Sequence, residues 1–150
     1  MPQSLANLHI HVVFSTKHRT PLITDAVRPA LHAYMATVLQ GVDCPVALIN
    51  SVEDHVHILC ALARTVAVSQ MIEKVKASSS RWMKTQGEPF VAFAWQSGYG
   101  AFSVSESQVE TVRGYIAKQA EHHRRATFQD EYRQFLQRHR LAFDEHYVWD

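Results

Sequence analysis

Apolar and polar residues alternate along residues 8–15, where every second residue is apolar and two histidines occupy positions between. A period of two residues is typical of a half-buried β-strand. We predict further strands over residues 44–52, 55–63 and 101–105. Because only two residues separate the second segment from the third, these two are predicted to form a hairpin.

Four helices are predicted, over residues 24–40, 66–85, 107–125 and 127–139. The first two carry apolar residues at a spacing of three to four, which is typical of an amphipathic helix. Gly41 follows the first helix as a C-cap. Ser107 with Glu110 three residues later has the form of a capping box, and Thr127 with Asp130 marks the start of the last helix.

The predicted order of elements is β-α-β-β-α-β-α-α. Its first six elements match the split β-α-β order of an α+β, ferredoxin-like (RRM-like) fold, an antiparallel sheet with helices on one side. The first and third strands are then neighbours at the centre. We expect one domain over residues 1–150, with a sheet core at about 5–106, a helix at about 107–125, and a C-terminal helix and tail at about 127–150.

Composition indicates a globular protein. The 150 residues are 47% hydrophobic, which is enough for a sizeable core. No apolar run reaches the roughly 20 residues needed to span a bilayer, and the N-terminal residues do not resemble a signal peptide. Cys44 and Cys60 stand alone in apolar segments and are expected to be reduced. We therefore expect a cytoplasmic protein that does not contact a membrane.

Two His-x-His pairs stand out among the ten histidines. His55 and His57 lie two apart on a predicted strand, so their imidazoles share one face and could bind one metal ion. His9 and His11 have the same spacing, which therefore cannot choose between the pairs. Asp54 beside the second pair is either an acceptor that orients an imidazole or a turn residue.

Tyr115 and Gln119 are four residues apart on a predicted helix, so their side chains share one face. A phenol has a pKa near 10 and attacks poorly unless its target is made electrophilic. A divalent ion bound to a phosphate oxygen has that effect, and Gln119 offers an oxygen ligand to the same ion. A set of two histidines and an amide fits manganese at least as well as magnesium. Helical tyrosines are also common packing residues.

The net charge of +1 does not by itself indicate nucleic-acid binding. Exposed basic residues are nevertheless candidates for contact with a phosphate backbone. Three aromatic residues, Trp95, Tyr99 and Phe102, are candidates for stacking on unpaired bases. The basic candidates are Lys17, Arg19, Lys74, Arg81, Lys84 and Lys118.

Seven segments in order along the chain resemble one known family. They are Val-Phe-Ser-Thr-Lys (13–17), Val-Glu-Asp-His-Val-His-Ile-Leu (52–59), Ser-Ser-Ser-Arg-Trp (78–82), Phe-Ala-Trp-Gln (93–96), Gly-Tyr-Gly-Ala-Phe-Ser-Val-Ser (98–105), Tyr-Ile-x-x-Gln-x-x-His-His (115–123) and Asp-Glu-x-Tyr-Val-Trp (144–149). Together they resemble the single-tyrosine HUH transposases of small bacterial and archaeal insertion sequences and their REP-associated relatives.

The resemblance implies a DNA transposase that cleaves and rejoins single-stranded DNA. His55 and His57 match the metal-binding histidines, and Gln119 matches the residue that completes the metal site. Tyr115 matches the nucleophile, which forms a 5′-phosphotyrosine. His11 then becomes a candidate neighbour of the metal-binding pair.

The resemblance further implies a divalent metal, Mg²⁺ or Mn²⁺, and no nucleotide cofactor or small-molecule substrate. The implied partners are single-stranded DNA with hairpin ends and a second copy of the chain in a homodimer.

Three other classes of protein share part of this pattern. A histidine-triad hydrolase needs a third histidine where Leu59 stands. A two-histidine phosphoesterase needs Thr or Ser at positions 11 and 57, where histidines stand. The serious alternative is a domesticated, non-catalytic protein of the same fold that binds single-stranded nucleic acid.

Overall fold

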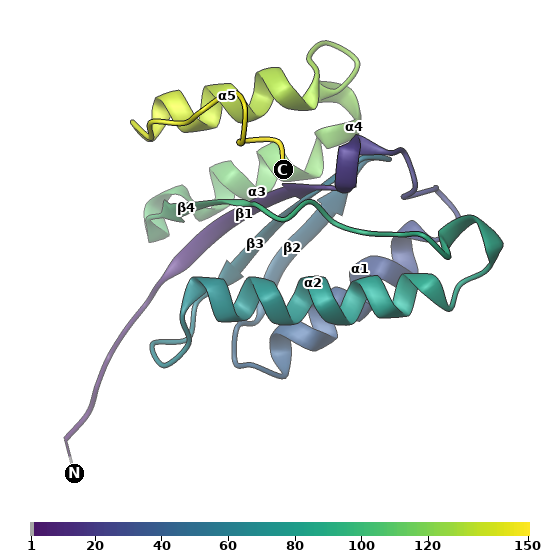
Figure 1. Ribbon diagram of the computed structural model, residues 1–150. Helices are drawn as coiled ribbons and strands as arrows, with labels where there is room; N and C mark the ends of the chain where they lie inside the picture. Colours follow the sequence, from purple (N-terminus) through teal and green to yellow (C-terminus); the bar gives the residue numbers. More distant parts are fainter. Residues whose placement is uncertain (1) are drawn as a thin grey trace.

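The computed structural model describes residues 2–150 as a four-stranded antiparallel sheet with helices on both faces (Figure 1). The strand order is β2-β3-β1-β4. The two central strands are therefore β1 and β3, as predicted. The strands are β1 (His9–Ser15), β2 (Val46–Ser51), β3 (His55–Ala61) and β4 (Gly100–Val104).

One face of the sheet is covered by α1 (Arg28–Gln40) and α2 (Val68–Lys84) (Figure 1). The alternate apolar residues of β1 and β3, among them Val12, Phe14 and Ile58, pack against these helices in the larger core. Gly41 caps the end of α1, as predicted. The histidines at the intervening positions of both strands therefore point to the other face.

The opposite face is covered by α3 (Val109–Ala117), α4 (Gln119–His122) and α5 (Phe128–Arg138) (Figure 1). The side chain of Thr127 accepts a hydrogen bond from the backbone N–H of Asp130 at 3.2 Å, which confirms the predicted start of α5. Phe128, Tyr132 and Phe135 of α5 pack with Phe102 of β4 in a second core. This cover makes the histidine face an interior surface.

The helix predicted over residues 107–125 is divided in the structure. It breaks at Lys118, whose backbone (φ −102°, ψ 23°) is not helical. The Asn50 side chain of β2 donates hydrogen bonds to the carbonyls of Ile116 (2.8 Å) and Ala117 (3.4 Å). Because those carbonyls are satisfied by a strand residue, the helix can end there.

The capping box predicted at Ser107 was wrong. Ser107 lies in a 3₁₀ turn over Glu106–Gln108, and its hydroxyl lies 3.2 Å from that of Ser105. The helix begins only at Val109, and no side chain caps the backbone N–H groups of its first turn. One 3₁₀ turn therefore separates the end of β4 from the start of α3.

The last residues fasten α5 to the sheet. Trp149 packs against Phe128 and Tyr132 of α5. The carbonyl of Asp150 accepts hydrogen bonds from the backbone N–H of Gly98 at 2.7 Å and from the Gln96 side chain at 3.2 Å. Among residues 2–150 no helix is both long enough and apolar enough to cross a membrane.

Candidate active site

His55 and His57 lie side by side on β3, and both are fully buried. In the paired strand β1, Ser15 stands opposite His55 and Val13 opposite His57. Both imidazoles point toward the helices on the opposite face of the sheet from α1 and α2, where they contact Gln119 of α4 and Glu131 of α5. Their Nε2 atoms face the space between β3 and these helices.

The outer nitrogen of each imidazole has its own hydrogen-bond partner. His55 Nδ1 lies 2.7 Å from Asp54 Oδ1, and His57 Nδ1 lies 2.8 Å from His11 Nε2. Partners of this kind fix the orientation of an imidazole and direct its other nitrogen inward. The structure therefore brings Asp54 and His11 to the positions expected of orienting residues. His9 instead contacts the exposed carboxylate of Glu106.

Gln119 and Tyr115 approach the histidines from α4 and α3. Gln119 is fully buried, and its Oε1 lies 3.4 Å from His55 Nε2 and 3.0 Å from His123 Nε2. Its Nε2 has no hydrogen-bond partner among residues 2–150. The half-buried Tyr115 ring stacks on His122, with ring centroids 4.6 Å apart. Despite the break at Lys118, both side chains reach the same site.

Two residues of the site were given no role from the sequence, His123 after α4 and Glu131 of α5. Glu131 Oε1 lies 2.9 Å from His57 Nε2, 3.3 Å from His123 Nε2 and 3.5 Å from His55 Nε2. Its other oxygen, Oε2, accepts a hydrogen bond from the Tyr115 hydroxyl. One ligand atom from each of the three histidines and Glu131 lie within 4.8 Å of one another, so the group could hold a metal ion.

A sequence signal for Glu131 existed. The residue lies three positions after Phe128 and four before Phe135, on the apolar stripe of α5. A carboxylate on such a stripe is buried when the helix docks, and a buried carboxylate needs partners. His123 carried a weaker signal, since it lies four residues after Gln119 on the same side of the chain.

The protonation of the cluster follows from burial and from Glu131. Burial lowers the pKa of His57 to about 4 and that of His11 to about 3. Burial also opposes a charge on His55, but its hydrogen bonds to Asp54 and Glu131 outweigh this and raise its pKa. Burial of Glu131 is likewise outweighed, by hydrogen bonds from the histidines, so its pKa falls below the usual range.

Tyr115 remains a neutral phenol in this environment. Burial and the neighbouring Glu131 carboxylate raise the pKa of its hydroxyl. Since the phenolate is the stronger nucleophile, attack by Tyr115 requires a target made more electrophilic by another group.

Only some of the predicted DNA-contacting residues lie near this site. Arg19 lines an open hollow whose wall also includes Asp54, His123 and Arg125. Lys118 lines an adjoining hollow with Arg125. The exposed Lys74, Arg81 and Lys84 lie on α2, across the sheet from the histidines, and Lys17 lies in the 3₁₀ turn Lys17–Arg19.

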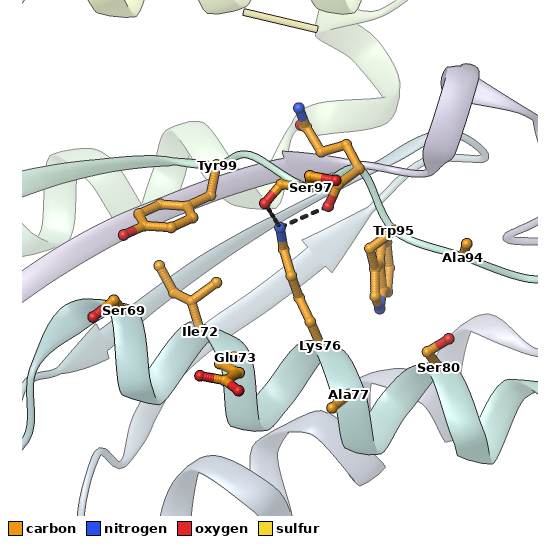
Figure 2. A pocket seen from close by; sticks show the side chains of 11 residues that line it. Ser69, Ile72, Glu73, Lys76, Ala77, Ser80, Ala94, Trp95, Ser97 and Tyr99 are labelled. Atoms are coloured by element: carbon orange, nitrogen blue, oxygen red, sulfur yellow. Dashed lines mark hydrogen bonds between the residues drawn. The ribbon is translucent and has the colours of Figure 1, made fainter. Parts of the chain in front are cut away.

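The stacking expectation was wrong for Trp95 and Phe102, because both are buried in the two cores. Tyr99 remains 38% exposed. It borders a groove on the α2 side of the sheet, shown in Figure 2.

In that groove Lys76 rises from α2 between Trp95 and Tyr99 (Figure 2). Its ammonium donates hydrogen bonds to the carbonyls of Gln96 (2.8 Å) and Ser97 (3.3 Å). Burial lowers its pKa to about 8. Lys76 thus anchors the segment that leads into β4, the same segment that holds Asp150.

Comparison with known proteins shows the family to which the chain belongs. The family described as "Transposase IS200 like" matches residues 4–119, and the chain belongs to this family. No curated protein matches the chain.

Two solved structures show the same fold. A protein from Deinococcus radiodurans R1 assigned to the transposases is 20% identical, with a TM-score of 0.63, over 79% of this chain and 98% of the other. A REP-associated tyrosine transposase bound to a REP hairpin is 11% identical, with a TM-score of 0.53, over 77% of this chain and 66% of the other.

Proposed function

We propose that this transposase cleaves and rejoins single-stranded DNA through a covalent bond to Tyr115. The observation that carries the proposal is the meeting of a tyrosine hydroxyl with a histidine, glutamine and glutamate cluster beneath α5. A structural tyrosine needs no such neighbours, because a single acceptor would satisfy its hydroxyl.

The cluster fits a divalent metal. His55 and His57 turn Nε2 inward, and Gln119 turns its oxygen toward the same point while its amide nitrogen has no partner among residues 2–150. This orientation of the amide is the one that a metal ligand requires. Mixed nitrogen and oxygen donors suit Mn²⁺ at least as well as Mg²⁺. When bound, such an ion polarises a phosphate oxygen.

In the proposed reaction the Tyr115 oxygen attacks the phosphorus of one phosphodiester. The O–H bond of Tyr115 breaks and the O–P bond to Tyr115 forms, while the bond from phosphorus to the 3′ oxygen breaks. The proton lost by the phenol is balanced by one that the departing 3′ oxygen takes up, so that it leaves as a hydroxyl. The product is a 5′-phosphotyrosine. Because one phosphodiester replaces another, the released or a new 3′-hydroxyl can reverse the step without a nucleotide cofactor.

The substrate proposed is single-stranded DNA with a hairpin. One protein of the same fold is bound to a REP hairpin. Here Arg19, Arg124 and Arg125 line the hollow that opens beside His123, where they can meet phosphates. A homodimer stays a prediction. Tyr115 and His57 of one chain already meet through Glu131, so this nucleophile and metal-binding pair need no second subunit to come together.

The test is a cleavage assay on single-stranded hairpin DNA from the ends of the element that encodes the chain. Wild type with Mg²⁺ or Mn²⁺ is expected to form a covalent protein–DNA adduct that EDTA prevents and that Tyr115→Phe cannot form. Hairpin binding without an adduct in either metal would instead place the protein among non-catalytic nucleic-acid binders.

A further inference from the structure

The family match ends at Gln119, yet the cluster continues beyond it with His123 and Glu131. These two residues come from the loop after α4 and from α5, the part of the chain that folds over the histidine face. Glu131 is 5% exposed, although five of the other charged residues of α5 or its flanks, Asp130, Arg138, Arg140, Asp144 and Glu145, lie at the surface. Its burial against three imidazoles therefore calls for an explanation.

The separations between donor atoms have the size expected for ligands of one small ion. Ligands held at about 2.1 Å from a metal stand about 3 Å apart when they are adjacent. Glu131 Oε1 lies 2.9 Å from His57 Nε2 and 3.3 Å from His123 Nε2. Gln119 Oε1 lies 3.0 Å from His123 Nε2 and 3.4 Å from His55 Nε2.

The nature of the donors points the same way. His55 Nδ1 faces the Asp54 carboxylate, which turns Nε2 toward the cluster. Two oxygen atoms, Gln119 Oε1 at 3.4 Å and Glu131 Oε1 at 3.5 Å, face this Nε2. Imidazole nitrogens together with amide and carboxylate oxygens form a donor set that suits a divalent ion such as Mn²⁺.

We propose that His123 and Glu131 are additional ligands of the same divalent ion as His55, His57 and Gln119 in the DNA-free protein. The inference rests on the metal site of the proposed function and extends its ligand set from three donors to five. Glu131 would also connect the ion with the nucleophile, since its second oxygen accepts the Tyr115 hydrogen bond. Metal site and nucleophile are then completed by α5 of the same chain.

Mn²⁺ binding to the full-length, metal-free protein without DNA tests the ligand set. Isothermal titration is expected to show affinity at least about tenfold weaker for Glu131→Gln and for His123→Asn than for wild type. Glu106→Gln is the matched control, because it removes an exposed carboxylate that contacts His9 outside the cluster. The control is expected to bind like wild type.

Pulsed electron paramagnetic resonance of bound Mn²⁺ counts the coordinated imidazole nitrogens and needs no variant. Three are expected in wild type and two in His123→Asn. Two nitrogens in wild type, or unchanged affinity in both variants, would overturn the proposal. Tighter binding by Glu131→Gln would also overturn it, since Glu131 would then compete with the ion.

Failure of this inference differs from failure of the proposed function. Wild type that forms the Tyr115 adduct but shows two coordinated nitrogens keeps the function and loses the extra ligands. Wild type that binds Mn²⁺ through three nitrogens but forms no adduct keeps the ligands and loses the function.

Discussion

Tyr115 donates a hydrogen bond to one carboxylate oxygen of Glu131, whose other oxygen lies 2.9 Å from His57 Nε2. One carboxylate thus connects the candidate nucleophile on α3 with the candidate metal ligands on β3. The connection exists only because α5 lies across the histidine face. Any change that displaces α5 should therefore affect both the metal site and Tyr115.

Gly100 of β4 allows α5 to approach the sheet. A Cβ atom at this position would stand 2.6 Å from a ring carbon of Tyr132, which is buried and cannot move freely. We expect Gly100→Val to lower the melting temperature and to weaken Mn²⁺ binding together, because Glu131 moves with Tyr132. Thermal unfolding measures the melting temperature, and isothermal titration measures the affinity for Mn²⁺. Full retention of metal affinity despite a lower melting temperature would contradict this coupling.

Asp54 orients His55 from outside the cluster at 2.7 Å. We expect Asp54→Asn to weaken Mn²⁺ affinity by roughly 10- to 100-fold, because the ring loses its charged acceptor. Asp25→Asn is the control, since Asp25 is an exposed carboxylate that pairs with Arg28 instead. Equal affinity in the two variants would show that Asp54 is only a turn residue.

Acid should destabilise the fold through His57 and His11. Each has a pKa lowered from 6.5, to about 4 and about 3, mainly by burial. The unfolded chain therefore binds more protons than the fold below pH 6.5, so this stability is complete above pH 6.5 and is lost as the pH falls toward 4. For His57 alone the loss is about 3 kcal/mol.

The raised pKa of His55 has the opposite effect, because it makes the fold more stable as the pH falls. A variant that lacks one lowered histidine therefore separates its contribution from that of His55. His11→Asn removes one of the two groups and should show a smaller loss of unfolding free energy between pH 6.5 and 4 than wild type. Urea unfolding in EDTA at several pH values measures both losses. An equal loss of unfolding free energy in wild type and in His11→Asn would contradict a contribution from His11.

DNA binding should depend on the basic residues beside the site more than on those of α2. We expect Arg19→Ala with Arg125→Ala to weaken hairpin binding and to reduce the salt slope by about 0.7–0.9 per residue. The control changes Lys74 and Arg81, exposed on α2 across the sheet. Equal losses in the two double variants would place the DNA on both faces.

The strands and the histidine face could be predicted because they follow from local patterns. Alternation in residues 8–15 and 55–63 separates the core residues from the histidines without knowledge of the rest of the fold. Once these two strands are neighbours, the approach of His11 to His57 follows from the sheet. The start of α5 at Thr127 was equally local, since one side chain and one backbone N–H define it.

The features of the fold and the site that could not be predicted depend on contacts between segments far apart in the sequence. The break at Lys118 is stabilised by Asn50 from another strand, which no helical pattern reveals. Glu131 lies on the apolar stripe of α5, but the groups that surround its carboxylate depend on where α5 docks. Burial of Trp95 and Phe102 depends on which helix covers each face of the sheet. These features required the assembled fold.

The most direct test of the proposed reaction identifies the bond between protein and DNA. Hairpin DNA labelled at either its 5′ or its 3′ end is incubated with the protein and Mn²⁺, and the adduct is digested and analysed by mass spectrometry. If Tyr115 is the nucleophile, only the 3′-labelled fragment stays attached, through a 5′-phosphate on the peptide that contains Tyr115. Attachment of the 5′-labelled fragment, or to another residue, would contradict it.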